Sequence, residues 1–96
     1  MSSDPWSVQL EYYVDEPVHH DVLEDVERRM RSDPSGCPRT DVTQTEMHLA
    51  QYLVVVNTRL SPADPVEAGR QASELAERHL PAHGPLYRLT VWRYVV

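Results

Sequence analysis

Hydrophobic and polar residues alternate without interruption along residues 6–14, WSVQLEYYV. Successive side chains of a strand point to opposite faces, so this pattern predicts a strand with one face in a core. It is the first and most regular strand pattern of the chain, and we expect it at the centre of a small sheet. The predicted core positions are Trp6, Val8, Leu10, Tyr12 and Val14.

The next apolar residues recur at helical spacing. Two acidic residues followed by Pro17 are typical of a helix start, and the turn-forming segment 33–38 predicts its end. The apolar stripe of this first predicted helix comprises Val18, Val22, Leu23, Val26 and Met30.

A second helix is predicted by a strong start signal. Asp64 can cap it, Pro65 suits its first position, and Glu67 completes a capping box. Its inner stripe is rich in small side chains, which predicts a close approach to the sheet: Ala68, Ala72, Leu75, Ala76 and Leu80.

The remaining segments are predicted to be strands. Residues 39–60 divide into strands 39–46 and 48–60 with a tight hairpin at 46–48, although a single long bent strand is the alternative. A last strand covers 87–96. The predicted order is βαββαβ.

This order predicts one α+β domain over residues 1–96 with the ferredoxin-like fold. Its antiparallel sheet would have the strand order 4-1-3-2, with both helices on one face. The segments PWSVQLEYYVDEPV and SPADPVEAGRQASE resemble those of small actinobacterial proteins of this βαββαβ shape. The resemblance implies a fold and an origin, and it carries no functional residues.

The composition of the chain limits the classes of partner that we expect. The chain is acidic, with a formal net charge of −6, which disfavours nucleic-acid binding. It has no apolar run long enough to span a membrane, and its first residues lack the pattern of a signal peptide. A single cysteine, Cys37, fits a reducing compartment, so we expect a cytoplasmic protein.

Several activities hosted by this fold lack their motifs. A metallochaperone needs a CxxC pair, and an RNA-recognition domain needs a basic aromatic segment that 51–60 does not provide. An acylphosphatase-like activity needs a glycine-rich loop that binds phosphate after the first strand. Asp15 and Glu16 occupy that position instead and would repel phosphate. We therefore expect no cofactor.

All five histidines map to one edge of the predicted sheet: His19, His20, His48, His79 and His83. Asp15 and Glu16 join them, and His79 and His83 are four residues apart, one helical turn if the helix extends that far. One hypothesis is a divalent-metal site or a pH-sensitive edge. The alternative is that loop ends merely collect polar residues.

The sheet face opposite the helices is predicted to be unusually apolar and aromatic. Such a patch is typical of an interface, and we expect it to form a homodimer. The alternative is a one-residue register shift in one strand, which would turn these side chains inward. The candidate interface residues are Gln9, Glu11, Tyr13, Leu53, Val55, Trp92 and Tyr94.

These observations favour a non-enzymatic interaction or regulatory module that acts as a homodimer through its sheet face. The alternative is a small-molecule-binding dimer of the α/β-barrel type with cofactor-independent enzyme activity. Its candidate pocket groups would be Tyr12, Asn57, Trp92 and His48. No nucleophile–base pair can be placed among them.

Overall fold

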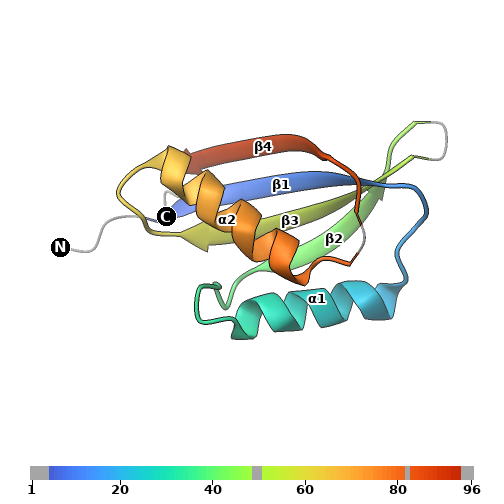
Figure 1. Ribbon diagram of the computed structural model, residues 1–96, viewed down its shortest axis with the longest axis horizontal. Coiled ribbons are helices and arrows are strands. Elements are labelled where there is room, and N and C mark those ends of the chain that lie inside the picture. The colour runs from blue at the N-terminus through green and yellow to red at the C-terminus, as the bar shows by residue number, and fades with distance from the viewer. Residues whose placement is uncertain (1–4, 49–50, 82, 94–96) are drawn as a thin grey trace.

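The computed structural model describes residues 5–48, 51–81 and 83–93. They form a four-stranded antiparallel sheet and two helices (Figure 1). The elements follow in the order β1 (Trp6–Val14), α1 (His20–Ser32), β2 (Asp41–Glu46), β3 (Tyr52–Leu60), α2 (Pro65–His79) and β4 (Leu86–Arg93).

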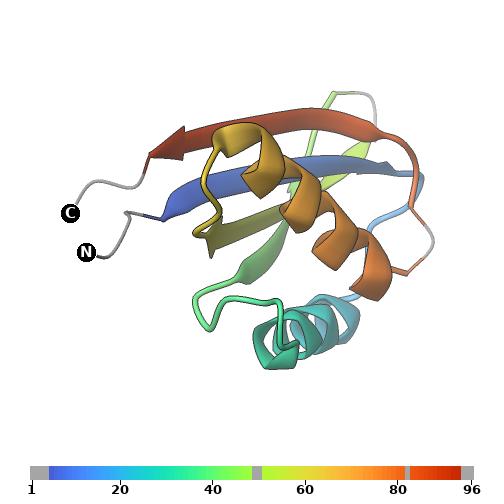
Figure 2. The same cartoon turned by 60° about the vertical axis from the view of Figure 1, so that its left-hand side comes forward.

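The sheet has the strand order β2-β3-β1-β4, which is the predicted order read from the other edge. β1 is central and pairs antiparallel with β3 on one side and β4 on the other. Both helices cover the same face, as the two views in Figures 1 and 2 agree. The opposite face, called the open face below, carries no helix.

The alternation predicted for β1 is confirmed. Val8, Leu10 and Tyr12 are fully buried in the core beneath the helices, and Trp6 and Val14 pack against that core. α1 buries Leu23, Val26 and Met30 of its predicted stripe, whereas Val22 is exposed and Val18 precedes the helix. The core thus forms between one apolar face of the sheet and two apolar helix stripes.

α2 approaches the sheet closely because its inner face is made of small residues. Ala68, Ala72 and Ala76 are fully buried. A Cβ atom added at Gly69 would lie 3.0 Å from the Leu89 side chain, so the helix backbone there rests almost directly on β4.

The first helix starts later than predicted. α1 begins at His20, and the ring of His19 caps it by accepting a hydrogen bond from the Asp21 N–H at 3.2 Å. The side-chain amide of Gln44, on β2, bonds both the N–H and the carbonyl of Val18. This contact from a distant strand keeps Val18 outside the helix.

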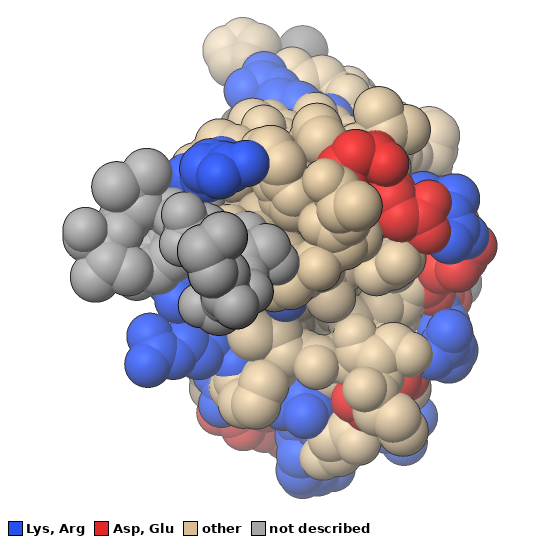
Figure 3. Space-filling model, turned by 90° about the vertical axis from the view of Figure 1, so that its left-hand side faces the viewer, with Lys and Arg blue, Asp and Glu red and all other residues tan. Residues whose placement is uncertain are grey.

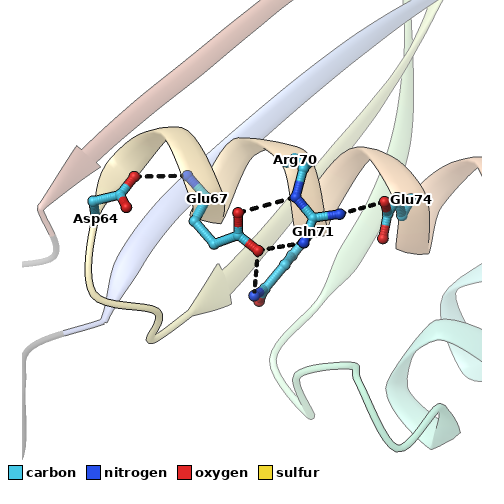
Figure 4. Close-up of polar contacts among 5 residues, drawn as sticks. All are labelled: Asp64, Glu67, Arg70, Gln71 and Glu74. Carbon is cyan, nitrogen blue, oxygen red and sulfur yellow. Dashed lines mark hydrogen bonds and ion pairs between the residues drawn. The ribbon is translucent and has the colours of Figure 1, made fainter.

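The second helix starts as predicted, but its capping box is only half formed (Figure 4). Asp64 accepts a hydrogen bond from the Glu67 N–H at 2.9 Å. The Glu67 carboxylate does not reach back. It pairs with Arg70 and also accepts from Gln71, as Figure 4 shows, and the Arg70 hydrogen bond lowers the pKa of Glu67 to about 2.

Two strand boundaries also differ from the predictions. β2 and β3 are separate strands, but the connection is longer than the predicted hairpin, because β3 begins at Tyr52 and Met47 donates a hydrogen bond to the Gln51 carbonyl. β4 has a register shift opposite Glu11 and Tyr12, where Tyr87 is the extra residue. The interface candidate Tyr94 lies outside the described residues.

Candidate functional site

The five histidines do not converge. His19 caps α1, His20 pairs with Glu24 on the same helix, and His48 is exposed after β2. α2 ends at His79, so His83 is not one helical turn further along, and its ring packs edge-on against Tyr12. Within the described ranges, no three His, Cys, Asp or Glu residues gather in a way that could hold a metal ion.

His79 has a structural partner. Its Nε2 atom lies 2.7 Å from the carboxylate of Asp33, the residue that ends α1. Arg78 donates to the same oxygen at 2.8 Å, and the Ser35 N–H donates to the other at 2.8 Å. These contacts join the ends of the two helices, and they lower the pKa of Asp33 to about 2, chiefly through the His79 hydrogen bond.

The open face carries the expected strand residues. Tyr13 pairs with Leu53, Glu11 with Val55, and Gln9 with Thr90, while Trp92 lies beside Ser7. These residues are absent from the core cluster beneath the helices, so the predicted registers of β1, β3 and β4 are supported over the described residues.

Exposure on that face differs from the expectation. Leu53 and Val55 are only 4% and 9% exposed in the single chain, so a partner docking there would cover little more of them. Trp92, in contrast, is 45% exposed. The apolar surface still available is concentrated on β4 rather than across the whole face.

The two edges of the sheet differ in how their outward backbone groups are hydrogen-bonded. On β2, the Val42 N–H is bonded by the Glu27 carboxylate at 3.0 Å, and the Thr40 carbonyl accepts from Arg31 Nε at 2.7 Å. Both α1 side chains therefore satisfy backbone groups that point away from the sheet. Such contacts hinder pairing with another chain at the start of this edge.

The edge of β4 has no such cover among the described residues. Tyr13 exchanges backbone hydrogen bonds with Gly84 and Pro85, so the alternating ladder directs the backbone groups of Leu89 and Val91 away from β1. No hydrogen bond from the described part of the chain reaches those outward groups. β4 is therefore an open edge (Figure 1).

Large apolar side chains are exposed on both faces of this edge. Of the six that are exposed in the described chain, four lie on β4, and a fifth, Val66, stands at the start of α2. On the helix side, an apolar groove runs between α2 and β4, lined by Pro65, Val66, Gly69, Leu89 and Val91.

A different, polar hollow of about 240 Å³ lies at the end of the sheet where β1 begins. It contains two of the four pocket groups predicted from the sequence, Asn57 and Trp92. The other two are elsewhere. Tyr12 is buried under the helices, where burial and its hydrogen bond to Glu77 raise its pKa, and His48 lies beyond the opposite end of β2.

The remaining polar residues of the hollow were not predicted from the sequence: Ser7, Arg39, Asp41, Thr58 and Arg59. The cross-strand pairing of these residues could have indicated that they lie together. Asp41 pairs with Asn57, Arg59 with Ser7, and Ser7 with Trp92 across neighbouring strands. Arg39 precedes β2 by two residues, so its place in the hollow could have been predicted only with the correct start of β2.

None of the described helices has the length and apolar character needed to cross a lipid bilayer. Comparisons of the chain with protein-family models, with curated proteins and with solved structures found no match.

Proposed function

We propose that the protein is a non-enzymatic interaction module whose working form is a homodimer joined through the edge of β4. The observation that carries this proposal is the contrast between the two sheet edges. Side chains of α1 bond two backbone groups at the start of the β2 edge, whereas no such bond reaches the described β4 edge, which is flanked by exposed apolar side chains. An open edge of this kind favours strand addition.

A second copy fits this edge because the strand is self-complementary. In an antiparallel β4–β4 pair with Thr90 on the two-fold axis, the outward backbone groups of Leu89 meet those of Val91 in the other copy. Leu89 is 42% exposed, and this pairing would cover it with Val91 and the Val66 end of the apolar groove. The contact is then the same in both copies, as a two-fold interface requires.

Charge supports the same register. β4 carries Arg88 and Arg93 and no acidic residue. With Thr90 on the axis, Arg88 of one copy lies opposite Trp92 of the other, a cation–π pairing that avoids opposed arginines. The pairing would extend the two four-stranded sheets into one continuous sheet.

The proposal includes two finer assignments. The interleaved βαβ units and their strand order support a ferredoxin-like fold. We assign the protein to the cytoplasm, because the single cysteine of the chain, Cys37, has no partner for an internal disulfide.

The test is the oligomeric state of Leu89→Pro, measured by sedimentation equilibrium. Proline removes an N–H that points away from β1, so it spares the internal ladder and removes a hydrogen bond to the partner strand. We expect the wild-type protein to have twice its 11.1 kDa chain mass and the variant to be monomeric. Leu89→Ala is the matched control, which keeps the N–H and should retain a weakened dimer.

Trp92→Glu separates edge pairing from a dimer formed through the open face. In the proposed register, the new carboxylate lies opposite Arg88, so the dimer persists. In an open-face dimer, the same charge would be buried and the dimer would dissociate. A monomeric wild-type protein, or a monomeric Trp92→Glu with a dimeric Leu89→Pro, would overturn the edge proposal.

A further inference from the structure

The polar hollow on the open face is built by a small residue between large ones. Ser7 on β1 lies between Arg59 on β3 and Trp92 on β4 in one row across the sheet. Because the Ser7 side chain is short, it leaves a depression, and the larger side chains of Arg59 and Trp92 form its sides. Val8 and Thr58, whose side chains belong to the helix face, complete the floor.

The charge of the hollow is opposite to that of the whole chain. Two arginines, Arg39 and Arg59, line it together with a single acidic residue, Asp41. The Asp41 carboxylate already accepts a hydrogen bond from the Asn57 amide at 3.1 Å. Of the described side chains that line the hollow, two are therefore basic and one is acidic, whereas the whole chain has a formal charge of −6.

Figure 3 views the molecule from the end where β1 begins and β4 ends. Basic side chains lie at several places on this surface, and acidic side chains gather mainly on one side of it.

Individual groups in the hollow are available to a ligand. Arg39 is exposed and forms no ion pair with the described residues. A guanidinium group presents a fork of donors that matches the two oxygens of a carboxylate. The Ser7 hydroxyl lines the same hollow from β1, which is separated from β2 by β3, and can act as a further donor.

Trp92 adds a flat apolar wall. Its indole is half exposed and lines the same hollow as the two arginines. The hollow has a volume of about 240 Å³ and is open to solvent on one side. That space suits a molecule with a single small ring rather than a nucleotide.

We propose that this hollow binds a small carboxylate with a flat apolar body, the carboxylate bonded by Arg39 and the body packed against Trp92. The site uses neither the outward backbone groups of β4 nor the groove beside α2. Arg39 precedes β2, at the other edge of the sheet from β4. Arg39 is therefore remote from the proposed dimer interface, whereas Trp92 is shared with it, because Arg88 of the second copy lies opposite Trp92 there.

Benzoate is the probe, with benzyl alcohol as its uncharged counterpart. The readout is the indole N–H resonance of Trp92 in a ¹⁵N–¹H spectrum, assigned by comparison with Trp92→Phe. We expect saturable, millimolar binding of benzoate, and a dissociation constant at least about tenfold higher in Arg39→Gln, because a charge-assisted hydrogen bond is lost. The resonance should barely respond to benzyl alcohol.

Arg28→Gln is the matched control, because it removes the same charge from the exposed surface of α1 and should leave benzoate binding unchanged. The proposal is overturned if benzyl alcohol shifts Trp92 as benzoate does, if Arg39→Gln binds benzoate like the wild-type protein, or if no saturation occurs at millimolar benzoate. Sedimentation of Arg39→Gln should match the wild-type protein, which separates a failure of this site from a failure of the dimer.

Discussion

At the residue scale, Asp33 connects two helices that are far apart in the sequence. It ends α1, its side chain is only 7% exposed, and its carboxylate accepts hydrogen bonds from Arg78 and His79 at the end of α2. Ser35 adds a backbone donor. A buried acceptor with three donors is typical of a structural junction, so His79 has a role that needs no metal.

Asp33→Asn should lower the free energy of unfolding by about 1–3 kcal/mol near neutral pH, because a charged acceptor of several hydrogen bonds becomes neutral. The folded-state pKa is depressed to about 2 from a reference value of 3.8. The carboxylate therefore stabilises the fold above the reference value, and this stabilisation is lost as the pH falls through the folded-state pKa.

Urea denaturation across the acid range measures both effects. The difference between wild-type protein and Asp33→Asn should be constant above about pH 5 and vanish near pH 2. Asp15→Asn, a change at an exposed position in the β1–α1 connection, is the control and should stay within about 0.5 kcal/mol of the wild-type value. A difference that persists at about pH 2 would contradict the assignment.

At the scale of elements, helix boundaries could be predicted only where their signals were local. Asp64 and Pro65 lie beside the start of α2, and that start was predicted correctly. The start of α1 was not, because Gln44 holds Val18 from a strand 26 residues away. The partner that determines this boundary cannot be recognised from local spacing.

The contact between α2 and β4 gives a prediction at the same scale. Gly69→Ala should raise the free energy of unfolding by about 0.5 kcal/mol, since alanine in a helix is favoured over glycine by about 1 kcal/mol and part of this gain is offset by displacing Leu89. Leu89 is half exposed and flexible, so it can yield by a few tenths of an ångström.

Chemical denaturation of a double-mutant cycle tests this balance. Adding Gly69→Ala to Leu89→Ala should recover the full gain of about 1 kcal/mol, because the opposing side chain is gone. An equal effect of Gly69→Ala in both backgrounds would show that the two residues are not coupled.

At the scale of the whole molecule, the open edge links stability to association. Because dimerisation stabilises only the folded state, the melting temperature should increase with protein concentration. A tenfold increase adds about 1.4 kcal/mol per dimer, which corresponds to about 3–6 °C for a chain of this size.

Differential scanning calorimetry of the wild-type protein and Leu89→Pro over a range of concentrations measures this dependence. The melting temperature of the variant should not change with concentration. A melting temperature of the wild-type protein that is equally independent of concentration would contradict association through β4.

By itself, the sequence determined the type and order of the elements, the central position of β1, the strand order and the faces of the strands. The elements and their faces follow from the two-residue period of strands, the helical period and short-range capping signals, and the strand order follows from the handedness of the βαβ connections. Over the described residues, the expected side chains also lie on the open face, because alternation alone assigns a residue to one face or the other.

Only the tertiary structure decided what those surfaces can do. Coverage of Leu53 and Val55, protection of the β2 edge by Glu27, and the hollow above Ser7 all depend on residues brought together from different elements. Exposure and hydrogen bonding are properties of such neighbourhoods rather than of any one segment. For this reason the alternation of β1 and the edge position of β4 could be predicted from the chain, whereas the different hydrogen bonding of the two sheet edges could not.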